Sequence, residues 1–349
     1  MRIRLYSLDV LRGIAALLVL VYHMEELGVA AWPHLFSWGW IGVDLFFVLS
    51  GFFISLSVIV PSSWSFLNFI KRRFLRIAPP YYVSMIIIMA ISGMYFLTTS
   101  NGLYHSLSHF LFLHSYSPQT HGSINGAYWS LGVEFSFYIL IGLSAAILRQ
   151  KKRAGYILIG AVIFSWLWRT GCFLYIENDA MQRFIWSTQV FGMLDEFAIG
   201  VSIALIYTHV EMSKLFRHVW LPFVLLFAGL GMVIAYVLHA VSVNYWFDYS
   251  TMVFSRTFLA LGFGMIILSF IGLEKYDLFI KACRWSGLCF VGTISFSIYL
   301  YHLPIIQATV NVKDSVGSIN AISLSVIFMT MLVAWGSYIF VESRFMRTH

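Results

Sequence analysis

Ten apolar runs recur along this chain, and each is long enough to cross a bilayer core of about 30 Å, which takes about 20 residues. The sequence is 60% hydrophobic and only 11% charged over 349 residues, a balance that excludes an ordinary soluble domain. Short alternating segments typical of a membrane β-barrel are absent. The sequence therefore predicts an all-α, polytopic transmembrane helix bundle. The expected spans are residues 7–27, 39–60, 81–97, 127–148, 155–176, 184–207, 220–238, 251–271, 286–309 and 321–341.

The distribution of Lys and Arg predicts the orientation, because basic residues collect in cytoplasmic loops. If both termini are cytoplasmic, only Arg169, Arg183, Arg256 and Lys313 fall on the outer side, and the other 18 of the 22 basic residues lie inside. This asymmetry supports the count of about ten spans. It also explains the net charge of +7 as membrane topology, so we expect membrane lipids and no nucleic acid as partners.

The first run, SLDVLRGIAALLVLVYHMEEL, carries ionisable residues that are costly inside a bilayer and are therefore functional candidates. Arg12 and His23 are eleven residues apart, which is almost three helical turns, so both side chains are expected on one face. They would be about 16 Å apart along the helix axis. One stripe thus places a cation near one membrane surface and an imidazole in the opposite half.

Two carboxylates in other spans need partners for the same reason. Asp44 lies in GVDLFFVLSGFFIS, where Ser50 begins a Ser-Gly pair that either allows close helix packing or belongs to the site. Glu134 lies roughly 10 Å below the outer end of the fourth span. Its structural interpretation is an ion pair with Arg169 or Arg256, and its functional interpretation is a catalytic acid or base.

The fourth and ninth spans add candidates for binding an acceptor. Trp129 and Tyr128 form an aromatic pair suited to a sugar face, and Ser130 is one helical turn before Glu134. His302 precedes Pro304 and either packs near a kink or takes part in the site. Under the predicted topology, one set of residues from five spans falls in the outer half of the bilayer: His23, Asp44, Glu134, Arg256 and His302.

A compact cationic cluster, Lys71 to Arg76, precedes the third span in NFIKRRFLRIAPPYY. We expect Pro79-Pro80 to end this basic segment and to begin the next helix. A positive-inside anchor explains two or three such charges. Four of them within six residues also suit a polyphosphate, because the arginine fork matches phosphate oxygens.

The long outer connection, residues 98–126, contains His105, His109, His114 and His121 but no Lys or Arg. If it were helical, the first two could share one metal, but a solvated loop with scattered histidines is the expected state. The three cysteines form no CxxC pair. We therefore expect neither a metal site nor a disulfide framework.

Six stretches taken in order resemble the integral-membrane acyltransferase-three family, the bacterial ten-helix O-acyltransferases. They are SLDVLRGIAALLVLVYH, GVDLFFVLSGFFIS, KRRFLRIAPPYY, AYWSLGVEFSFY, ISFSIYLYHLP and FVESRF. Together they reach from residue 7 to residue 345. Tyr301 stands where many relatives have Trp, which is a small departure.

The resemblance implies transfer of an acyl group, usually acetyl, from cytosolic acyl-CoA to a hydroxyl of a cell-envelope glycan, at the bacterial inner membrane. Arg12 and His23 match the family's essential pair on the first helix, and Glu134 matches the acid of the fourth. The chain ends four residues after Phe345. We therefore expect one integral-membrane acyltransferase domain over residues 1–349, without the periplasmic esterase-like domain that some members carry.

The family's cytoplasmic arginine motif matches Arg72, Arg73 and Arg76, so the phosphates of acetyl-CoA or another acyl-CoA are expected there, with Arg12 near the pantetheine entry. The donor is a substrate, and no permanently bound cofactor is expected. Acceptors left open are O-antigen, exopolysaccharide, peptidoglycan and lipid-linked sugars.

His23 is expected to act as the general base, because its unperturbed pKa is near neutral. Asp44 or Glu134 would orient its imidazole, as the acid does in a hydrolase triad. Direct transfer is favoured, with an acyl-His23 intermediate as the second possibility.

Two other classes of function stay open. A transporter or flippase for a glycan or small anion would also place charges in the membrane. Paired hydrophobic repeats with broken helices would favour a transporter, and the sequence shows no such repeats. A structural partner of a polysaccharide machine would tolerate loss of both Arg12 and His23.

Overall fold

The computed structural model describes residues 4–30, 32, 36–61, 63–91, 95–310 and 318–347, and it describes these without the side chains of Lys151, Met346 and Arg347. Two of the basic residues used for the orientation, Arg2 and Lys313, lie outside this part of the chain, as do residues 92–94 of the predicted third span.

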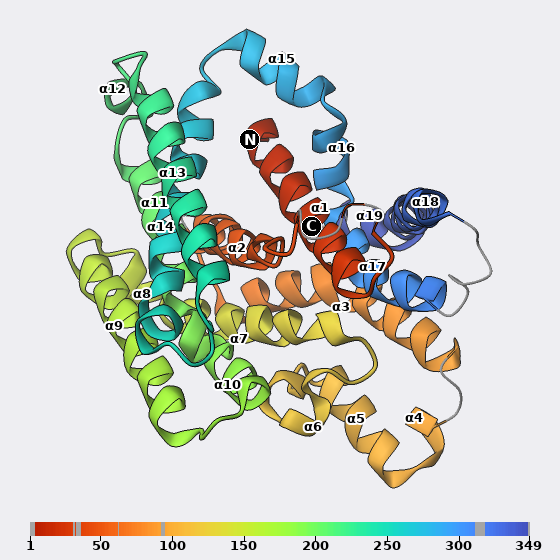
Figure 1. The fold of residues 1–349 in the computed structure, drawn as a ribbon. Coiled ribbons are helices and arrows are strands. Elements are labelled where there is room, and N and C mark those ends of the chain that lie inside the picture. Colours follow the sequence, from red (N-terminus) through yellow and green to blue (C-terminus); the bar gives the residue numbers. More distant parts are fainter. Residues whose placement is uncertain are drawn as a thin grey trace. The chain divides into compact units, whose positions relative to one another are not determined.

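The described residues form helices and turns and contain no β-strand (Figure 1). In chain order the elements are α1 (Tyr6–Glu26), α2 (Ile41–Ile59), α3 (Phe66–Ile91), α4 (Tyr95–Thr98), α5 (Ser100–Phe110), η1 (His114–Tyr116), α6 (Pro118–His121), η2 (Gly126–Tyr128), α7 (Trp129–Leu143), α8 (Ala145–Leu148), α9 (Lys151–Tyr175), α10 (Ala180–Ser187), η3 (Val190–Met193), α11 (Leu194–His209), α12 (Met212–Leu215), α13 (Leu221–Ser242), α14 (Tyr249–Leu273), α15 (Asp277–Trp285), α16 (Gly287–Thr293), α17 (Ser295–Val310), α18 (Ile319–Ser337), the π-helical turn η5 (Tyr338–Glu342) and α19 (Ser343–Arg347).

Within the described ranges, nine helical segments are long and apolar enough to cross a membrane, and a bent pair makes a tenth. Seven of the nine segments correspond mainly to one helix each, namely α1, α2, α3, α7, α9, α13 and α14. The other two are Val190–His209, which contains α11, and Ile319–Phe345, which begins with α18. This confirms the predicted all-α, polytopic fold with about ten spans.

Two predicted boundaries are wrong. The basic cluster from Lys71 to Arg76 does not precede the third span but lies inside α3, which continues through Pro79 and Pro80. Each proline removes one hydrogen bond to the carbonyl four residues earlier and its ring crowds that carbonyl, but its fixed φ is compatible with a helix. The predicted ninth span bends by 82° between α16 and α17, well before Pro304, where a kink was expected.

The chain divides into two compact units. The first contains Met1–Leu11, Asp44–Ile70 and Val133–Cys289, and the second contains Arg12–Val43, Lys71–Gly132 and Phe290–His349. Several helices, α1 among them, run from one unit into the other.

In the first unit, α9, α11 and α14 pack against one another, and α13 lies along α14 (Figure 1). Helix α11 approaches α2 closely because glycines meet there. A Cβ added at Gly200 would lie 2.1 Å from the carbonyl oxygen of Val48, and Gly51 faces the same contact. Small residues of this kind allow membrane helices to approach closely when no hydrophobic force from water drives them together.

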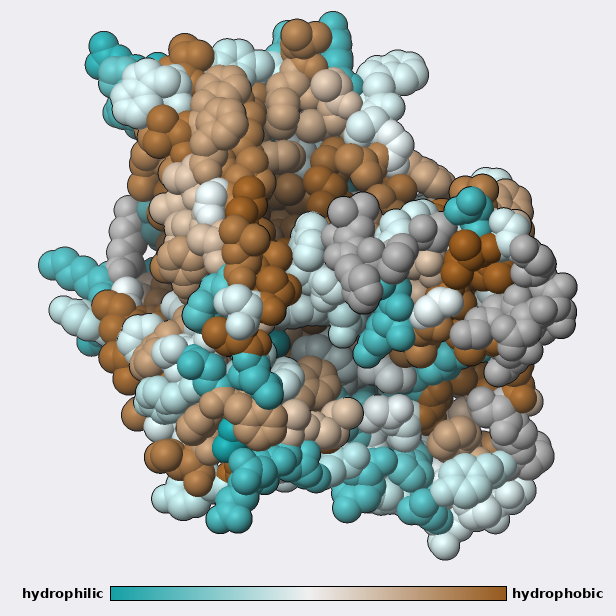
Figure 2. All heavy atoms as spheres, in the orientation of Figure 1, coloured by the Kyte–Doolittle hydropathy of each residue, from teal (hydrophilic) through white to brown (hydrophobic). Residues whose placement is uncertain are grey.

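The outward face of α13 is hydrophobic, which is the pattern expected of a helix in contact with lipid. Phe227 is 70% exposed and Leu238 is 63% exposed. Figure 2 shows hydrophobic residues gathered over α13 and α14, with hydrophilic residues at the end near α12. The apolar side chains point outward because the bilayer is itself apolar.

In the second unit, α17 packs against α18, and α1 joins them through an apolar core. Leu20 and Met24 of α1 meet Ile306 of α17 and Val326 of α18, and all four are buried. This core fixes the rotation of α1, so the stripe that contains Arg12 and His23 has a defined direction.

Candidate active site

His23 of α1 and His302 of α17 meet in the second unit, although 279 positions separate them in the sequence. His302 Nε2 lies 3.3 Å from His23 Nδ1, and the ring centroids are 5.0 Å apart. His302 is buried, whereas His23 is only partly buried. The structure thus brings two members of the predicted five-residue set, His23 and His302, into contact.

The surrounding carbonyl groups determine which ring nitrogens carry hydrogen. His23 Nδ1 lies 2.9 Å from the carbonyl oxygen of Val19, and His302 Nδ1 lies 2.9 Å from that of Tyr299. A carbonyl oxygen only accepts, so in both neutral rings Nδ1 must be the donor. The Nε2 of His302 then accepts from His23 Nδ1, which leaves the Nε2 of His23 with its lone pair.

A second buried polar group of the second unit lies in η5. Glu342 is 3% exposed and accepts a hydrogen bond of 2.9 Å from Ser297 Oγ of α17. Arg12 of α1 and Arg76 of α3 both lie within electrostatic range of this carboxylate. Arg12 and His23 both lie in the second unit, and their shared face on α1 stays a prediction from the helical spacing.

The other arginines of the cationic cluster lie along the first half of α3. Arg72 is exposed, whereas Arg73 and Arg76 are partly buried. Arg72 and Arg76 are one turn apart, so they share a face of α3. A helix rather than a loop therefore presents the predicted phosphate-binding residues.

In the first unit, Glu134 of α7 accepts two hydrogen bonds. Ser50 Oγ of α2 donates to its Oε1 at 2.6 Å, and Tyr138 OH donates to the same oxygen at 2.9 Å. The suggested ion pair of Glu134 with Arg169 or Arg256 is wrong, because each arginine pairs with another acid. Ser50 thus hydrogen-bonds to the carboxylate of Glu134.

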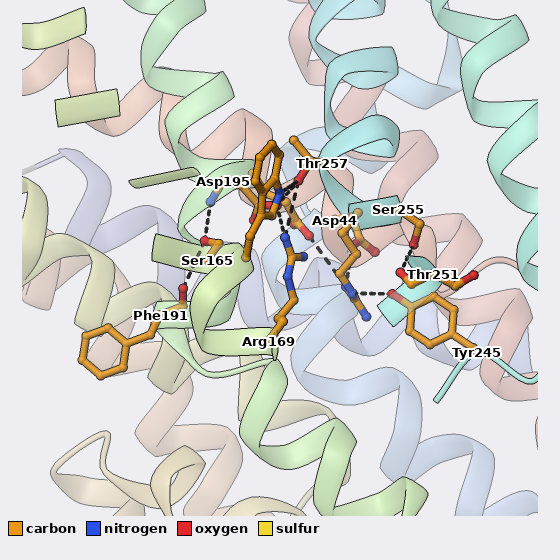
Figure 3. A network of polar contacts seen from close by, with 12 residues as sticks. Asp44, Ser165, Arg169, Phe191, Asp195, Tyr245, Thr251, Ser255 and Thr257 are labelled. Carbon is orange, nitrogen blue, oxygen red and sulfur yellow. Dashed lines mark hydrogen bonds and ion pairs between the residues drawn. The ribbon is translucent and has the colours of Figure 1, made fainter. Parts of the chain in front are cut away.

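Asp44 finds the partner that a buried carboxylate requires. Arg256 Nη1 of α14 lies 2.5 Å from Asp44 Oδ1 and 3.7 Å from Glu196 Oε1 of α11. Tyr245 OH accepts a hydrogen bond from Arg256 Nε at 3.1 Å. Figure 3 shows Asp44 and Tyr245 in this network of polar contacts.

A second ion pair continues this network. Arg169 of α9 pairs with Asp195, and both are buried. Thr257 Oγ1 donates to Asp195 Oδ2 at 2.5 Å and accepts from Trp166 Nε1 at 2.8 Å (Figure 3). Asp195 and Glu196 were not predicted as site residues, although two adjacent acids inside a predicted span were the available signal.

The expectation of a solvated histidine loop is wrong. His109 and His114 are fully buried and stack with ring centroids 4.0 Å apart. His109 Nδ1 contacts Tyr81 OH at 2.8 Å, and His114 Nε2 contacts the carbonyl oxygen of Tyr128 at 2.8 Å. Helix α5 and the short turns after it fold these rings against α3.

Burial determines the protonation of this histidine cluster. Desolvation lowers the pKa of His114 to about 4, and it lowers that of His121, aided by His114, to about 4. Burial and the neighbouring histidines also hold the pKa of His109 well below its usual value. No group of three or more potential metal ligands occurs among the described residues.

The predicted aromatic pair, Tyr128 and Trp129, does not present two rings to a sugar. Tyr128 is fully buried and contacts Ser84 Oγ at 2.7 Å, so it presents no face to a sugar. Trp129 is partly buried and stacks on His121 with centroids 5.8 Å apart. Ser130 is buried and contacts Tyr299 OH at 2.6 Å.

His23 belongs to the second unit, and Asp44 and Glu134 belong to the first. The orientation of the imidazole by one of these acids stays a prediction. Within the second unit, the groups that contact His23 Nδ1 are His302 and the backbone of Val19.

These features define a multi-pass membrane protein with intramembrane polar sites. Residues 5–341 match the acyltransferase domain family, so the chain belongs to that family. This confirms the predicted family and the transferase class, and it does not favour a transporter.

The chain is also similar in sequence to individual proteins with assigned names. The chain is 26% identical over 97% of its length to the peptidoglycan O-acetyltransferase OatA of Listeria monocytogenes, and it covers 55% of that protein. It is 24% identical over 96% of its length to the putative peptidoglycan O-acetyltransferase YrhL of Bacillus subtilis, covering 54% of it. An O-acetyl transferase of Shigella phage Sf6 is 33% identical over 45% of the chain, which covers 51% of the phage protein. The chain thus spans about half the length of these relatives, and no solved structure matches it.

Proposed function

We propose that this protein is an O-acetyltransferase that moves an acetyl group from acetyl-CoA to a hydroxyl of a cell-envelope glycan. The observation that carries the proposal is the geometry at His23. Its Nδ1 is held by the Val19 carbonyl and by His302, and its Nε2 keeps a lone pair in a partly buried position. This is the arrangement that a general base requires.

In the proposed reaction, His23 Nε2 takes the proton of the acceptor hydroxyl as that oxygen attacks the thioester carbonyl carbon. The carbon–sulfur bond breaks, and the proton passes from His23 to the departing thiolate, which leaves as CoA. The imidazolium formed in between donates from Nδ1 to Val19 and His302. These two acceptors therefore orient the imidazole, which is one of the two roles that the acid has in a hydrolase triad.

The arginines on α3 are suited to binding the acetyl-CoA donor. Arg72, Arg73 and Arg76 on α3 offer several planar forks for the phosphates of CoA. Arg12 lies on the same helix as His23, about 16 Å away along the axis. A pantetheine arm is an extended chain, so a donor anchored near Arg12 could present its thioester near His23.

The names of the relatives support an envelope glycan as the acceptor, because two of them are described as peptidoglycan O-acetyltransferases. We propose a hydroxyl of peptidoglycan as the first acceptor to test, before O-antigen, exopolysaccharide or lipid-linked sugars. We also propose that both termini face the cytoplasm of a bacterial inner membrane, with the donor inside and the acceptor outside. This follows from the distribution of Lys and Arg.

The test compares wild-type protein with His23→Ala in cells that lack the gene. The O-acetyl content of envelope glycans is measured by mass spectrometry, and acetyl-CoA consumption is measured with purified protein. Loss of a general base lowers the rate by a factor of about 100 to 10,000. We expect His23→Ala to remove acetylation while the protein stays folded in the membrane.

His218→Ala is the matched control, because His218 is exposed and stacks on Trp220. It should keep wild-type activity. Full activity in His23→Ala would remove His23 from the mechanism. An acetylated His23 trapped in wild-type protein would replace direct transfer with a covalent intermediate.

A further inference from the structure

We propose that Asp44 and Glu196 form a proton-binding site, in which the two carboxyl groups share one proton beside Arg256. All three residues belong to the first unit, whereas His23 belongs to the second. The inference therefore stands apart from acetyl transfer. It rests on the contacts of Glu196, on its burial and on the charge balance of the polar network around it.

Glu196 is enclosed by the protein but receives no hydrogen bond. It is 0% exposed, and within the described residues neither Oε1 nor Oε2 accepts a hydrogen bond. Arg256 Nη1 lies 3.7 Å from Oε1, which is beyond hydrogen-bonding distance. An ionised carboxylate only accepts, whereas a protonated carboxyl group can itself donate. A buried carboxylate that no donor reaches is costly, and such a group takes up a proton instead.

Asp44 supplies the acceptor for that proton. Its Oδ1 lies 2.5 Å from Arg256 Nη1, the same nitrogen that approaches Glu196 Oε1, so the two carboxyl groups are neighbours around one atom. Its other oxygen, Oδ2, is also buried and accepts no hydrogen bond from the described part of the chain. Two carboxyl groups that share one place do not both ionise, because the first charge opposes the second.

The other buried cations of the first unit are already engaged. Its buried arginines, among the described residues, are Arg169, Arg183 and Arg256. Arg169 pairs with Asp195 (Figure 3), and Arg183 donates to three backbone carbonyl groups. Tyr245, which contacts Arg256 Nε, is neutral at pH 7. The three buried acids of the network thus face two arginines, and one bound proton makes the network neutral.

A neutral network suits the position of these side chains. They come from α2, α9, α11 and α14, which belong to segments long and apolar enough to cross a membrane. An uncompensated charge is expensive there. A metal ion would also balance the charge, but the described residues contain no group of three or more potential metal ligands. A proton needs only the two carboxyl groups, and it is the ligand that we assign.

The experiment measures the infrared spectrum of the purified full chain in lipid nanodiscs at pH 7. The carbonyl stretch of a protonated carboxyl group lies at a higher frequency than the bands of amides and ionised carboxylates, and it shifts in D2O. We expect Glu196→Gln to lose one such band relative to wild type. Asp44→Asn should lose the same band, because Glu196 then becomes the ionised partner of Arg256. The double variant should show no greater loss.

The matched control is Glu177→Gln, because Glu177 is exposed, and it should leave the band unchanged. The Tm provides a second measurement. Gln has the shape of a protonated carboxyl group, and its amide can donate to Asp44, so Glu196→Gln should keep the wild-type Tm. Glu196→Ala removes this donor and should lower the Tm. The infrared comparison uses the Gln variant, so it does not depend on whether the Ala variant folds.

Each outcome decides the proposal. An unchanged carboxyl band in Glu196→Gln would show that Glu196 is ionised in the wild type and would overturn it. Loss of a different band in each single variant, with both lost in the double variant, would show two bound protons instead of one shared proton. A wild-type Tm that rises in sodium chloride but not in choline chloride, with no such rise in Glu196→Gln, would replace the proton with a metal ion. Acetyl transfer is not measured, so the proposed function is tested separately.

Discussion

The buried histidines near α5 predict that acid destabilises this protein. His114 and His121 both have a pKa of about 4 in the folded chain because they are desolvated. In the unfolded chain a histidine titrates near 6.5. Between these values the unfolded state binds more protons, so the free energy of unfolding falls as the pH falls.

The magnitude follows from the two pKa values. Between pH 7 and pH 5, each of these histidines removes about 2 kcal/mol of stability, or about 4 kcal/mol for both. His109, whose pKa is also lowered by burial, adds to the loss. A change of this size is a large part of the total stability of an ordinary domain.

The assay is unfolding by detergent titration in mixed micelles at pH 7, 6 and 5, with wild type and His114→Gln. Gln cannot be protonated in this range, and its amide can donate to the Tyr128 carbonyl that His114 Nε2 contacts. We expect the variant to lose about 2 kcal/mol less than wild type on acidification.

Exposed His218→Gln serves as the control and should follow the wild-type curve. The reasoning is refuted if wild-type stability is flat between pH 7 and pH 5. It is equally refuted if the full acid loss persists when His114 and His121 are both replaced by Gln.

Two further predictions concern packing and charge in the first unit. Gly200→Ala should cost about 1–3 kcal/mol in thermal or detergent unfolding, because the new Cβ would press on the backbone of α2. Gly160→Ala on α9, where a Cβ meets open space, should be neutral or stabilising by up to about 1 kcal/mol. Arg256→Met should destabilise by about 3–5 kcal/mol, because it leaves the buried acids Asp44 and Glu196 without their cation. Adding Asp44→Asn to that variant should recover part of the loss in a double-mutant cycle, and additive losses would show that the pair is not coupled.

Much of the fold could be predicted because the bilayer restricts the choices. Inside hydrocarbon every backbone group must be satisfied within the chain, so an apolar run of about 20 residues forms a helix. The predicted spans therefore reappear, with shifted ends. The errors occur where a local rule was overridden, as at Pro79 and Pro80, which a helix accommodates because only two of its hydrogen bonds are lost.

Within the candidate site, the helical period predicts that Arg12 and His23 share one side of α1, and this stays a prediction. The period did not reveal that His302 would contact His23. The histidines of residues 98–126 were misjudged because polar residues in a connection suggest solvent. Their burial depends on contacts with the Tyr81 side chain of α3 and the Tyr128 carbonyl of η2, which lie 28 and 14 positions away in the sequence.

The sequence alone determined that this chain is a membrane helix bundle and which side of each helix carries its polar groups, since both follow from apolar length and the 3.6-residue period. Only the tertiary structure decided which helix lies opposite each polar side. Asp44 meets Arg256 across 212 positions and leaves Glu134 to Ser50 and Tyr138. The helical period fixes a direction around one axis, whereas the partner found in that direction depends on how every other helix packs.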